Sequence, residues 1–227
     1  VTGESWPKQY TRLMERWFWT EKRSYDPILV WGLNRHQHFA TLGKAYRLTG
    51  DEKYAVECAS QIKSWVRDNP CDIGINWFDA LEIALRLISW TIAFHMMKTS
   101  DAFVNLGGEC FIKSLYQQAH FLSEHLSVYE PVPNNHLIGE VTALILVGAM
   151  FPEFKESEEW VQRGLDILER EIEKQNFDDG VNKEQSPSYQ RFVLDFTLLA
   201  LLLSEWNAIG EVPLTRRYTE RMLDYIM

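Results

Sequence analysis

Two polar clusters about fifty residues apart carry the side chains that could do chemistry in this chain. The first contains Asn135 and His136, and the second contains Glu184, Gln185 and Tyr189. Each cluster precedes a long apolar segment, so we expect both at helix entrances. An amide, an imidazole and a phenol placed there could neutralise a carboxylate and transfer a proton. That chemistry suits the cleavage of a uronic-acid polymer by β-elimination.

Elimination at a uronic acid makes three demands on a protein. The C5 proton lies beside a carboxylate and is hard to remove, because its loss creates a second negative charge. One group must neutralise the carboxylate, a base must take the proton, and an acid must protonate the oxygen that leaves C4. Asn135 or a protonated His136 suits the first role, and His136 or Tyr189 the second. Tyr189 suits the third, so these three residues are the predicted catalytic residues.

Several of these polar residues also have plausible structural roles. Asn134 is expected to be a helix N-cap, as is Ser186, with Pro187 as the first helical residue after it. Tyr189 could pack in the first turn of its helix, and Glu184 could simply cover the helix end. For the amide–imidazole pair, capping or surface polarity remains an alternative to catalysis.

Helical periodicity recurs along the chain, and strand signals are nearly absent. About nine helices are expected, over residues 10–22, 35–48, 51–66, 78–97, 101–128, 135–150, 156–175, 187–206 and 214–226. A bend is expected at Gly107-Gly108. Three of the helices, 78–97, 135–150 and 187–206, are apolar on most faces, whereas the charged ones look external. This alternation of inner and outer helices predicts an all-α fold, a toroid or solenoid of helical hairpins.

A weak repeat marks the starts of two inner helices. The pattern Asn-x5-Glu runs from Asn76 to Glu82 and again from Asn134 to Glu140, and Asn34 stands at a third entrance. If these entrances share one rim, their polar side chains converge on one cavity. The predicted substrate-binding residues are Asn34, Arg35, Asn76, Trp77, Glu140, Glu184 and Gln185. The alternative is that Asn caps each helix and Glu interacts with its dipole.

The composition bounds the possible partners. The chain has 227 residues, 46% of them apolar, and a formal charge of −9. It has no dense Lys/Arg cluster, which argues against nucleic-acid binding. An acidic polysaccharide or oligosaccharide would therefore need local cations at the site. The candidates for that role are Arg35, His36, His38, Arg86 and His136.

Other sequence features exclude several classes of site. No uninterrupted run of about eighteen apolar residues exists, so no membrane span is expected. The three cysteines are odd in number and form no CxxC pair, so neither a disulfide framework nor a zinc cluster is indicated, and no metal site is predicted. The first residues lack the basic and apolar regions of a signal peptide.

The order and spacing of several motifs resemble the heparinase II/III family of polysaccharide lyases over roughly residues 28–206. The motifs are Trp31-Gly32-Leu33-Asn34-Arg35, Gly74-Ile75-Asn76-Trp77 with Glu82 and Arg86, Pro133-Asn134-Asn135-His136, Phe151-Pro152-Glu153-Phe154, Asp179-Gly180 and Glu184-Gln185-Ser186-Pro187-Ser188-Tyr189. The resemblance implies an incomplete (α/α) toroid followed by a β-sandwich domain, with the glycan bound between them. It also implies that Asn135 neutralises the substrate carboxylate, that His136 matches a base of some members, and that Tyr189 is the acid. Asn76 and Trp77 match positions that line the family's substrate groove.

Two departures from the family pattern stand out. Gln190 follows Tyr189, where many members have His, and nothing follows Met227 where the family has its β-sandwich. We therefore expect residues 1–227 to be a single helical toroid domain of a larger enzyme, weakly active or inactive alone. No cofactor is expected in this domain, although the missing domain could hold a metal. A periplasmic or secreted location is expected.

Two other functions remain open from the sequence. A glycoside hydrolase on a similar barrel would need two carboxylates facing each other across a groove, about 5–10 Å apart. The candidates are Asp79, Glu82, Glu140 and Glu184. A non-catalytic helical scaffold or sugar-binding module predicts that the three catalytic candidates share no cavity. Heparan sulfate, alginate and a bacterial exopolysaccharide are all open as substrates.

Overall fold

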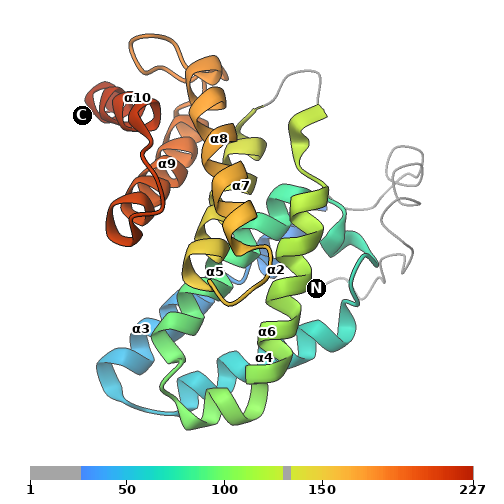
Figure 1. The fold of residues 1–227 in the computed structure, drawn as a ribbon. Helices are drawn as coiled ribbons and strands as arrows, with labels where there is room; N and C mark the ends of the chain where they lie inside the picture. The colour runs from blue at the N-terminus through green and yellow to red at the C-terminus, as the bar shows by residue number, and fades with distance from the viewer. Residues whose placement is uncertain (1–26, 130–133, 227) are drawn as a thin grey trace. The chain divides into compact units, whose positions relative to one another are not determined.

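The computed structural model describes residues 27–129 and 134–226, and these residues are almost entirely helical. The α-helices are α2 (Ile28–Asn34), α3 (His38–Thr49), α4 (Lys53–Asp68), α5 (Ala80–Met97), α6 (Asp101–Glu124), α7 (Asn135–Met150), α8 (Ser157–Gln175), α9 (Pro187–Asn207) and α10 (Pro213–Ile226). Two 3-10 helices, η1 (Ile75–Trp77) and η2 (Ser127–Tyr129), join them (Figure 1). The described residues contain no β-strand, only one isolated bridge between Asn176 and Asn182. The predicted all-α class is therefore confirmed.

The chain divides into two compact units, Val1–Phe121 and Leu122–Met227, and α6 crosses the boundary. The predicted helix at residues 10–22 and the predicted loop at 131–133 lie outside the described residues. The other predicted helices are all present, with ends that differ by a few residues. α2 is an additional helix that the sequence did not reveal.

In the first unit, α5 is the inner helix and α4 is amphipathic. α3 packs against both α4 and α5, and α2 contacts α5 and η1. The rings of Trp65 and Trp90 meet edge to face with centroids 5.5 Å apart, and Trp90 stacks on Phe111 of α6 at 5.7 Å. Aromatic pairs of this geometry add to the stabilisation from their buried area. Most of the tryptophans thus serve the core.

The start of α3 differs from the prediction. Instead of one helix over residues 35–48, α2 ends at Asn34 and α3 begins at His38. Between them, His36 has a φ of 54°, in the left-handed region where a right-handed helix cannot continue. Its ring lies 4.5 Å from that of Phe39 and accepts a hydrogen bond from Trp90. Burial of this ring fixes the break, which local sequence signals do not show.

α6 runs without interruption through Gly107 and Gly108, so the predicted bend is wrong. A Cβ atom at Gly107 would lie 3.3 Å from the Cβ of Ala59 on α4. The glycine therefore allows α4 and α6 to pack closely. α6 also ends at Glu124, earlier than the predicted residue 128, and η2 takes up the remainder.

In the second unit, α7 is the inner helix, and nearly all of its side chains are buried. α8 and α9 pack against α7, and α10 packs against α8 and α9 (Figure 1). Two glycines permit the contact between α7 and α8. A Cβ at Gly148 would lie 2.6 Å from the carbonyl oxygen of Ser157, and one at Gly164 would lie 2.6 Å from Cγ1 of Ile145. α8 is amphipathic, as expected of an outer helix.

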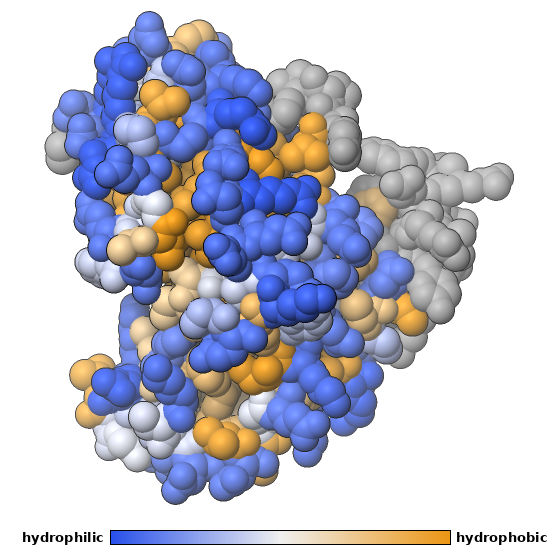
Figure 2. All heavy atoms as spheres, in the orientation of Figure 1, coloured by the Kyte–Doolittle hydropathy of each residue, from blue (hydrophilic) through white to orange (hydrophobic). Residues whose placement is uncertain are grey.

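The surface is largely hydrophilic, with scattered apolar side chains, on the face drawn in Figure 2. Among the described residues, α5 is the one helix long and apolar enough to cross a membrane by length and composition. However, 67% of it is buried inside the protein, and it contains Glu82 and Arg86. A core helix of a folded domain passes the same test, and the burial of α5 fits that interpretation.

Candidate functional site

The first polar cluster forms the N-terminus of α7. Asn134 has an extended backbone, and its Oδ1 accepts a hydrogen bond of 2.9 Å from the backbone N–H of His136. The predicted N-cap role of Asn134 is thus confirmed. Asn135 is the first helical residue, and only 3% of it is exposed. His136 is half-buried.

The second cluster contacts the first through Glu184. Oε1 of Glu184 accepts hydrogen bonds from the backbone N–H of Asn135 at 3.0 Å and from Asn135 Nδ2 at 2.8 Å. Its Oε2 lies 2.9 Å from the same Nδ2. A carboxylate at this end of α7 also interacts favourably with the helix dipole. The two motifs, which are 49 residues apart in sequence, therefore meet at one helix entrance.

A network of amides holds the loop that carries Glu184. The side chain of Asn182 accepts from the backbone N–H of Glu184 at 3.0 Å, and the backbone N–H of Asn182 donates to Gln190 Oε1 at 2.6 Å. Nε2 of Gln190 donates to the carbonyl of Gly180 at 2.8 Å. Gln190 and Asn182 are both buried. Gln190, the departure from the family pattern, thus fixes the loop between α8 and α9.

Sequence reasoning missed this supporting role of Asn182 and Gln190. A signal was present, because Gln190 is a polar residue directly before a long apolar helical run, where an amide needs partners. Its partners, however, lie eight and ten residues away in a loop of irregular backbone.

Tyr189 lies in the first turn of α9. Ser186 caps this helix and Pro187 is its first residue, as predicted; the Oγ of Ser186 accepts from the backbone N–H of Tyr189 at 3.5 Å. The side chain of Tyr189 is 47% exposed. Gln185, just before the cap, is exposed and has a φ of 54°. The candidate acid is therefore at the surface, five residues after the carboxylate that holds Asn135.

Glu140 is fully buried one turn further along α7. Its Oε1 accepts from the hydroxyl of Ser127 at 2.6 Å and its Oε2 from the backbone N–H of Ser127 at 2.8 Å. These bonds tie η2 to α7, so Glu140 has a clear structural role here. A substrate contact by Glu140 stays a prediction.

The candidates of the first unit form a second polar group. Arg35 donates from Nε and Nη2 to the two oxygens of Glu82 at 2.7 and 2.6 Å. This hydrogen bonding raises the pKa of Arg35 above its ordinary value. Asn34 donates from Nδ2 to the carbonyl of Val30 and accepts from Trp65 Nε1 at 2.6 Å. Both candidates are thus held by their own unit.

Asn76 and Trp77 are buried in η1. Nδ2 of Asn76 donates to Asn69 Oδ1 at 2.7 Å, and the indole of Trp77 donates to the carbonyl of Asn69 at 3.4 Å. Oδ1 of Asn76 is buried and has no hydrogen-bond partner within the described part of the chain. Asp79, rather than Asn76, caps α5 by accepting from two backbone N–H groups. Asn76 is thus no helix cap, which removes one structural alternative for it.

Two of the five cations expected to neutralise an acidic glycan are core residues. Arg86 is almost fully buried, donates to Gln118 Oε1 at 2.6 Å, and lies 4.3 Å from the ring of Trp65. Burial, and then the charge of Arg86, lowers the pKa of His36 to about 3. His36 is therefore neutral at physiological pH, and neither residue can act as a surface cation. The expectation for these two residues is wrong because their aromatic surroundings were not visible in the sequence.

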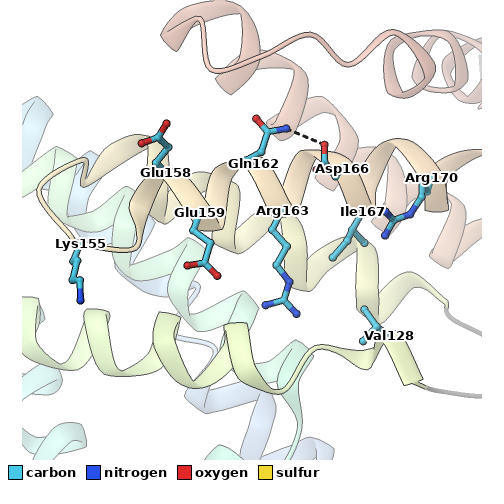
Figure 3. A pocket seen from close by; sticks show the side chains of 9 residues that line it. All are labelled: Val128, Lys155, Glu158, Glu159, Gln162, Arg163, Asp166, Ile167 and Arg170. Atoms are coloured by element: carbon cyan, nitrogen blue, oxygen red, sulfur yellow. Dashed lines mark hydrogen bonds between the residues drawn. The ribbon is translucent and has the colours of Figure 1, made fainter.

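The largest described pocket lies away from these residues. It has a volume of about 850 Å³ and follows α8 beside Val128 of η2. Figure 3 shows its basic and acidic side chains alternating along α8. Arg163 within it donates to the carbonyl of Ser123. A smaller pocket of about 440 Å³ flanks the start of α9 and is lined in part by Ser188 and Arg191. Within residues 27–129 and 134–226, no group of three or more His, Cys, Asp or Glu side chains is placed to hold a metal ion.

The carboxylates that a glycoside hydrolase would use are engaged elsewhere. Asp79 caps α5, and Glu82 is paired with Arg35. Glu140 is fully buried on Ser127. A hydrolytic pair needs one carboxyl to hold a proton and one to act on water across a groove. These environments do not favour hydrolysis.

Comparison with known proteins identifies relatives of this arrangement. A family described as Heparinase II/III N-terminus matches residues 5–227. A heparin-sulfate lyase of Bacteroides stercoris is 32% identical over 208 residues, which make up 83% of this chain and 30% of that protein. A heparin-sulfate lyase of Pedobacter heparinus is 35% identical over 180 residues, or 77% of this chain and 27% of that protein.

Solved structures agree with the sequence comparison. A crystal structure of heparinase III matches with a TM-score of 0.75 and 29% identity, over 86% of this chain and 30% of that one. The heparan sulfate lyase of Pedobacter heparinus matches with a TM-score of 0.72 and 31% identity, over 92% of this chain and 32% of that one. The chain thus spans about a third of the length of these relatives. The fold match confirms the expected class, an all-α domain of the incomplete (α/α) toroid type, and the chain belongs to the heparinase II/III family, of which it covers the N-terminal part.

Proposed function

We propose that the full-length protein containing this chain cleaves a uronic-acid-containing polysaccharide by β-elimination. The contact between Asn135 and Glu184 carries this proposal, because it joins the two chemically suited motifs at one helix entrance. The relatives named heparin-sulfate lyases support the reaction class.

In this proposal Asn135 binds the substrate carboxylate through its side-chain amide. That contact lowers the cost of the charge that builds up when the C5 proton leaves. Tyr189 gives a proton to the oxygen that leaves C4, which its exposed position at the start of α9 allows. His136 or Tyr189 removes the C5 proton. The bond from C4 to the departing oxygen breaks as the C4–C5 double bond forms, so electrons balance without a cofactor.

The substrate we propose is heparan sulfate or heparin, because both named relatives act on that class. Arg191 lies two residues after Tyr189 on α9 and is exposed, which gives an anionic glycan a local cation. Alginate, which carries no sulfate, becomes the comparison substrate. Asn76, Trp77, Asn34 and Arg35 are proposed to contribute to sugar binding.

The remaining expectations enter the proposal as follows. The rest of the full-length protein is proposed to include a β-sandwich domain that completes the substrate groove, with any metal held there. This chain alone is then weakly active or inactive. A periplasmic or secreted location would give the enzyme access to its polymer.

The test is digestion of heparan sulfate and of alginate by the full-length protein, followed by ultraviolet absorbance of the unsaturated uronate. The proposal expects this absorbance to rise with heparan sulfate. Tyr189→Phe should lower the rate by roughly 10²- to 10⁴-fold, the usual contribution of a general acid. Cleavage of the polymer without the unsaturated product would show that the reaction is not an elimination.

A further inference from the structure

We infer that Glu184 is a positioning residue that orients the side-chain amide of Asn135, an inference that rests on the proposed elimination. A carboxylate accepts hydrogen bonds only, so it selects which end of the amide faces it. Both oxygens of Glu184 lie within 2.9 Å of Asn135 Nδ2. The nitrogen, rather than Oδ1, is therefore held at the carboxylate.

The position of Glu184 decides which N–H of the amide remains for a ligand. Its Oε1 also accepts from the backbone N–H of Asn135 at 3.0 Å, so the carboxylate lies on the main-chain side of the amide. It thereby takes the N–H that points back toward the main chain. The other N–H of Nδ2 points away from it, where a substrate carboxylate can accept it. Without Glu184 the amide could turn over and present its oxygen, which repels a carboxylate.

Glu184 is itself held in place, although its side chain is exposed. Its backbone N–H donates to Asn182 Oδ1, and Asn182 is fixed by buried Gln190. Gln190 belongs to the same helical turn as Tyr189. The carboxylate that orients Asn135 is thus connected to the helix that carries the proposed acid.

A simple capping role would not need this geometry. The bond from the backbone N–H of Asn135 is enough to satisfy the helix end. The two contacts to Nδ2 add nothing to capping, but they are what an amide-orienting residue requires. Dependence on the Asn135 side chain therefore separates the two roles.

The experiment is a double-mutant cycle in the full-length protein, with heparan sulfate as substrate and the unsaturated product as readout. Its members are wild type, Glu184→Gln, Asn135→Ala and the double variant. Glu184→Gln keeps an oxygen for the backbone N–H but puts an NH2 group against Nδ2. Glu173→Gln, at an exposed position on α8, removes the same charge and is the matched control. Glu184→Asp, whose carboxylate is one methylene shorter, is the second variant if Glu184→Gln fails to fold.

We expect Glu184→Gln to lower kcat by roughly 10- to 100-fold, the scale of one charge-assisted hydrogen bond, with KM changed less. In the Asn135→Ala background the same substitution should change kcat by less than about twofold, because the oriented group is gone. Glu184→Asp should be intermediate, and Glu173→Gln should match wild type.

Several results would overturn the inference. An unchanged kcat in Glu184→Gln would leave the elimination intact and remove the positioning role. Equal losses with and without the Asn135 side chain would indicate capping alone. A faster Glu184→Gln enzyme would show that Glu184 occupies the place of the substrate carboxylate and blocks it. If wild type forms no unsaturated product, the proposed function fails, and this inference fails with it.

Discussion

Trp90 donates its indole N–H to Nδ1 of His36 across 2.9 Å in the core of the first unit. The accepting nitrogen must be without a proton, so the imidazole is neutral in the folded protein. Burial holds its pKa at about 3, and the nearby charge of Arg86 adds to this effect. In the unfolded chain the same imidazole titrates near its ordinary value of about 6.5.

A loss of stability at acidic pH follows from this relationship. Between about pH 6.5 and pH 3 the unfolded chain binds a proton that folded His36 does not, so stability falls as the pH falls. The loss should reach a few kcal/mol, by roughly 1.4 kcal/mol per unit of pKa difference. His36→Asn should remove this dependence, since Asn adopts the left-handed backbone readily. Hydrogen exchange of α3 peptides, compared between the two proteins at each pH, measures it; an equal pH response in both would contradict the assignment.

A substitution at Gly148 tests the close packing of α7 on α8. Gly148→Ala places a Cβ atom 2.6 Å from the carbonyl oxygen of Ser157, a backbone atom that cannot move without the helix. We expect a loss of about 1–3 kcal/mol, typical of overpacking. Gly32→Ala is the control, because no described atom lies within 4 Å of its Cβ position. Thermal unfolding of the full-length protein should show a lower midpoint for Gly148→Ala alone. Equal midpoints would mean that the two helices are further apart than described.

Asn135 and Asn134 should respond in opposite ways to the same change. Asn135→Asp brings a second carboxylate against Glu184, and two like charges at hydrogen-bond distance repel each other. We expect destabilisation at neutral pH that is relieved as the pH falls and one carboxyl takes a proton. Asn134→Asp adds the same charge one residue earlier but keeps an N-cap acceptor, so stability should change little. Unfolding midpoints at about pH 5 and pH 8 separate the variants, and a tolerated Asn135→Asp would argue against the described contact.

The phenol of Tyr189 should matter for turnover and little for folding. Its side chain is 47% exposed, so Tyr189→Phe should change stability by less than about 0.5 kcal/mol. Tyr225→Phe, a tyrosine on α10 that is 56% exposed, is the matched control. Lyase activity should fall in Tyr189→Phe only. An active Tyr189→Phe enzyme would remove Tyr189 from the role of acid.

Local signals predicted much of the fold. The caps at Asn134 and Ser186 were predictable because a side-chain oxygen there meets a backbone N–H within three residues. The all-α class followed from periodicity alone. The break at His36 was not predictable, because a left-handed histidine depends on a partner, Trp90, 54 residues away.

The site was predictable in its members more than in its connections. Sequence placed Asn135 and Glu184 at helix entrances, but their direct contact depends on a loop whose shape Gln190 fixes from the next helix. Glu140 reads as a rim residue from its spacing, yet Ser127 folds over it and buries it. Such contacts depend on which segments lie beside each other, and spacing along the chain carries no record of that.

The most direct test of the central claim is a digest of heparan sulfate by the full-length protein in water enriched in heavy oxygen, analysed by mass spectrometry. Elimination takes no oxygen from water, so the account predicts unlabelled products whose new ends carry the C4–C5 double bond. Hydrolysis would add one labelled oxygen to each new reducing end, and saturated, labelled products would contradict the account.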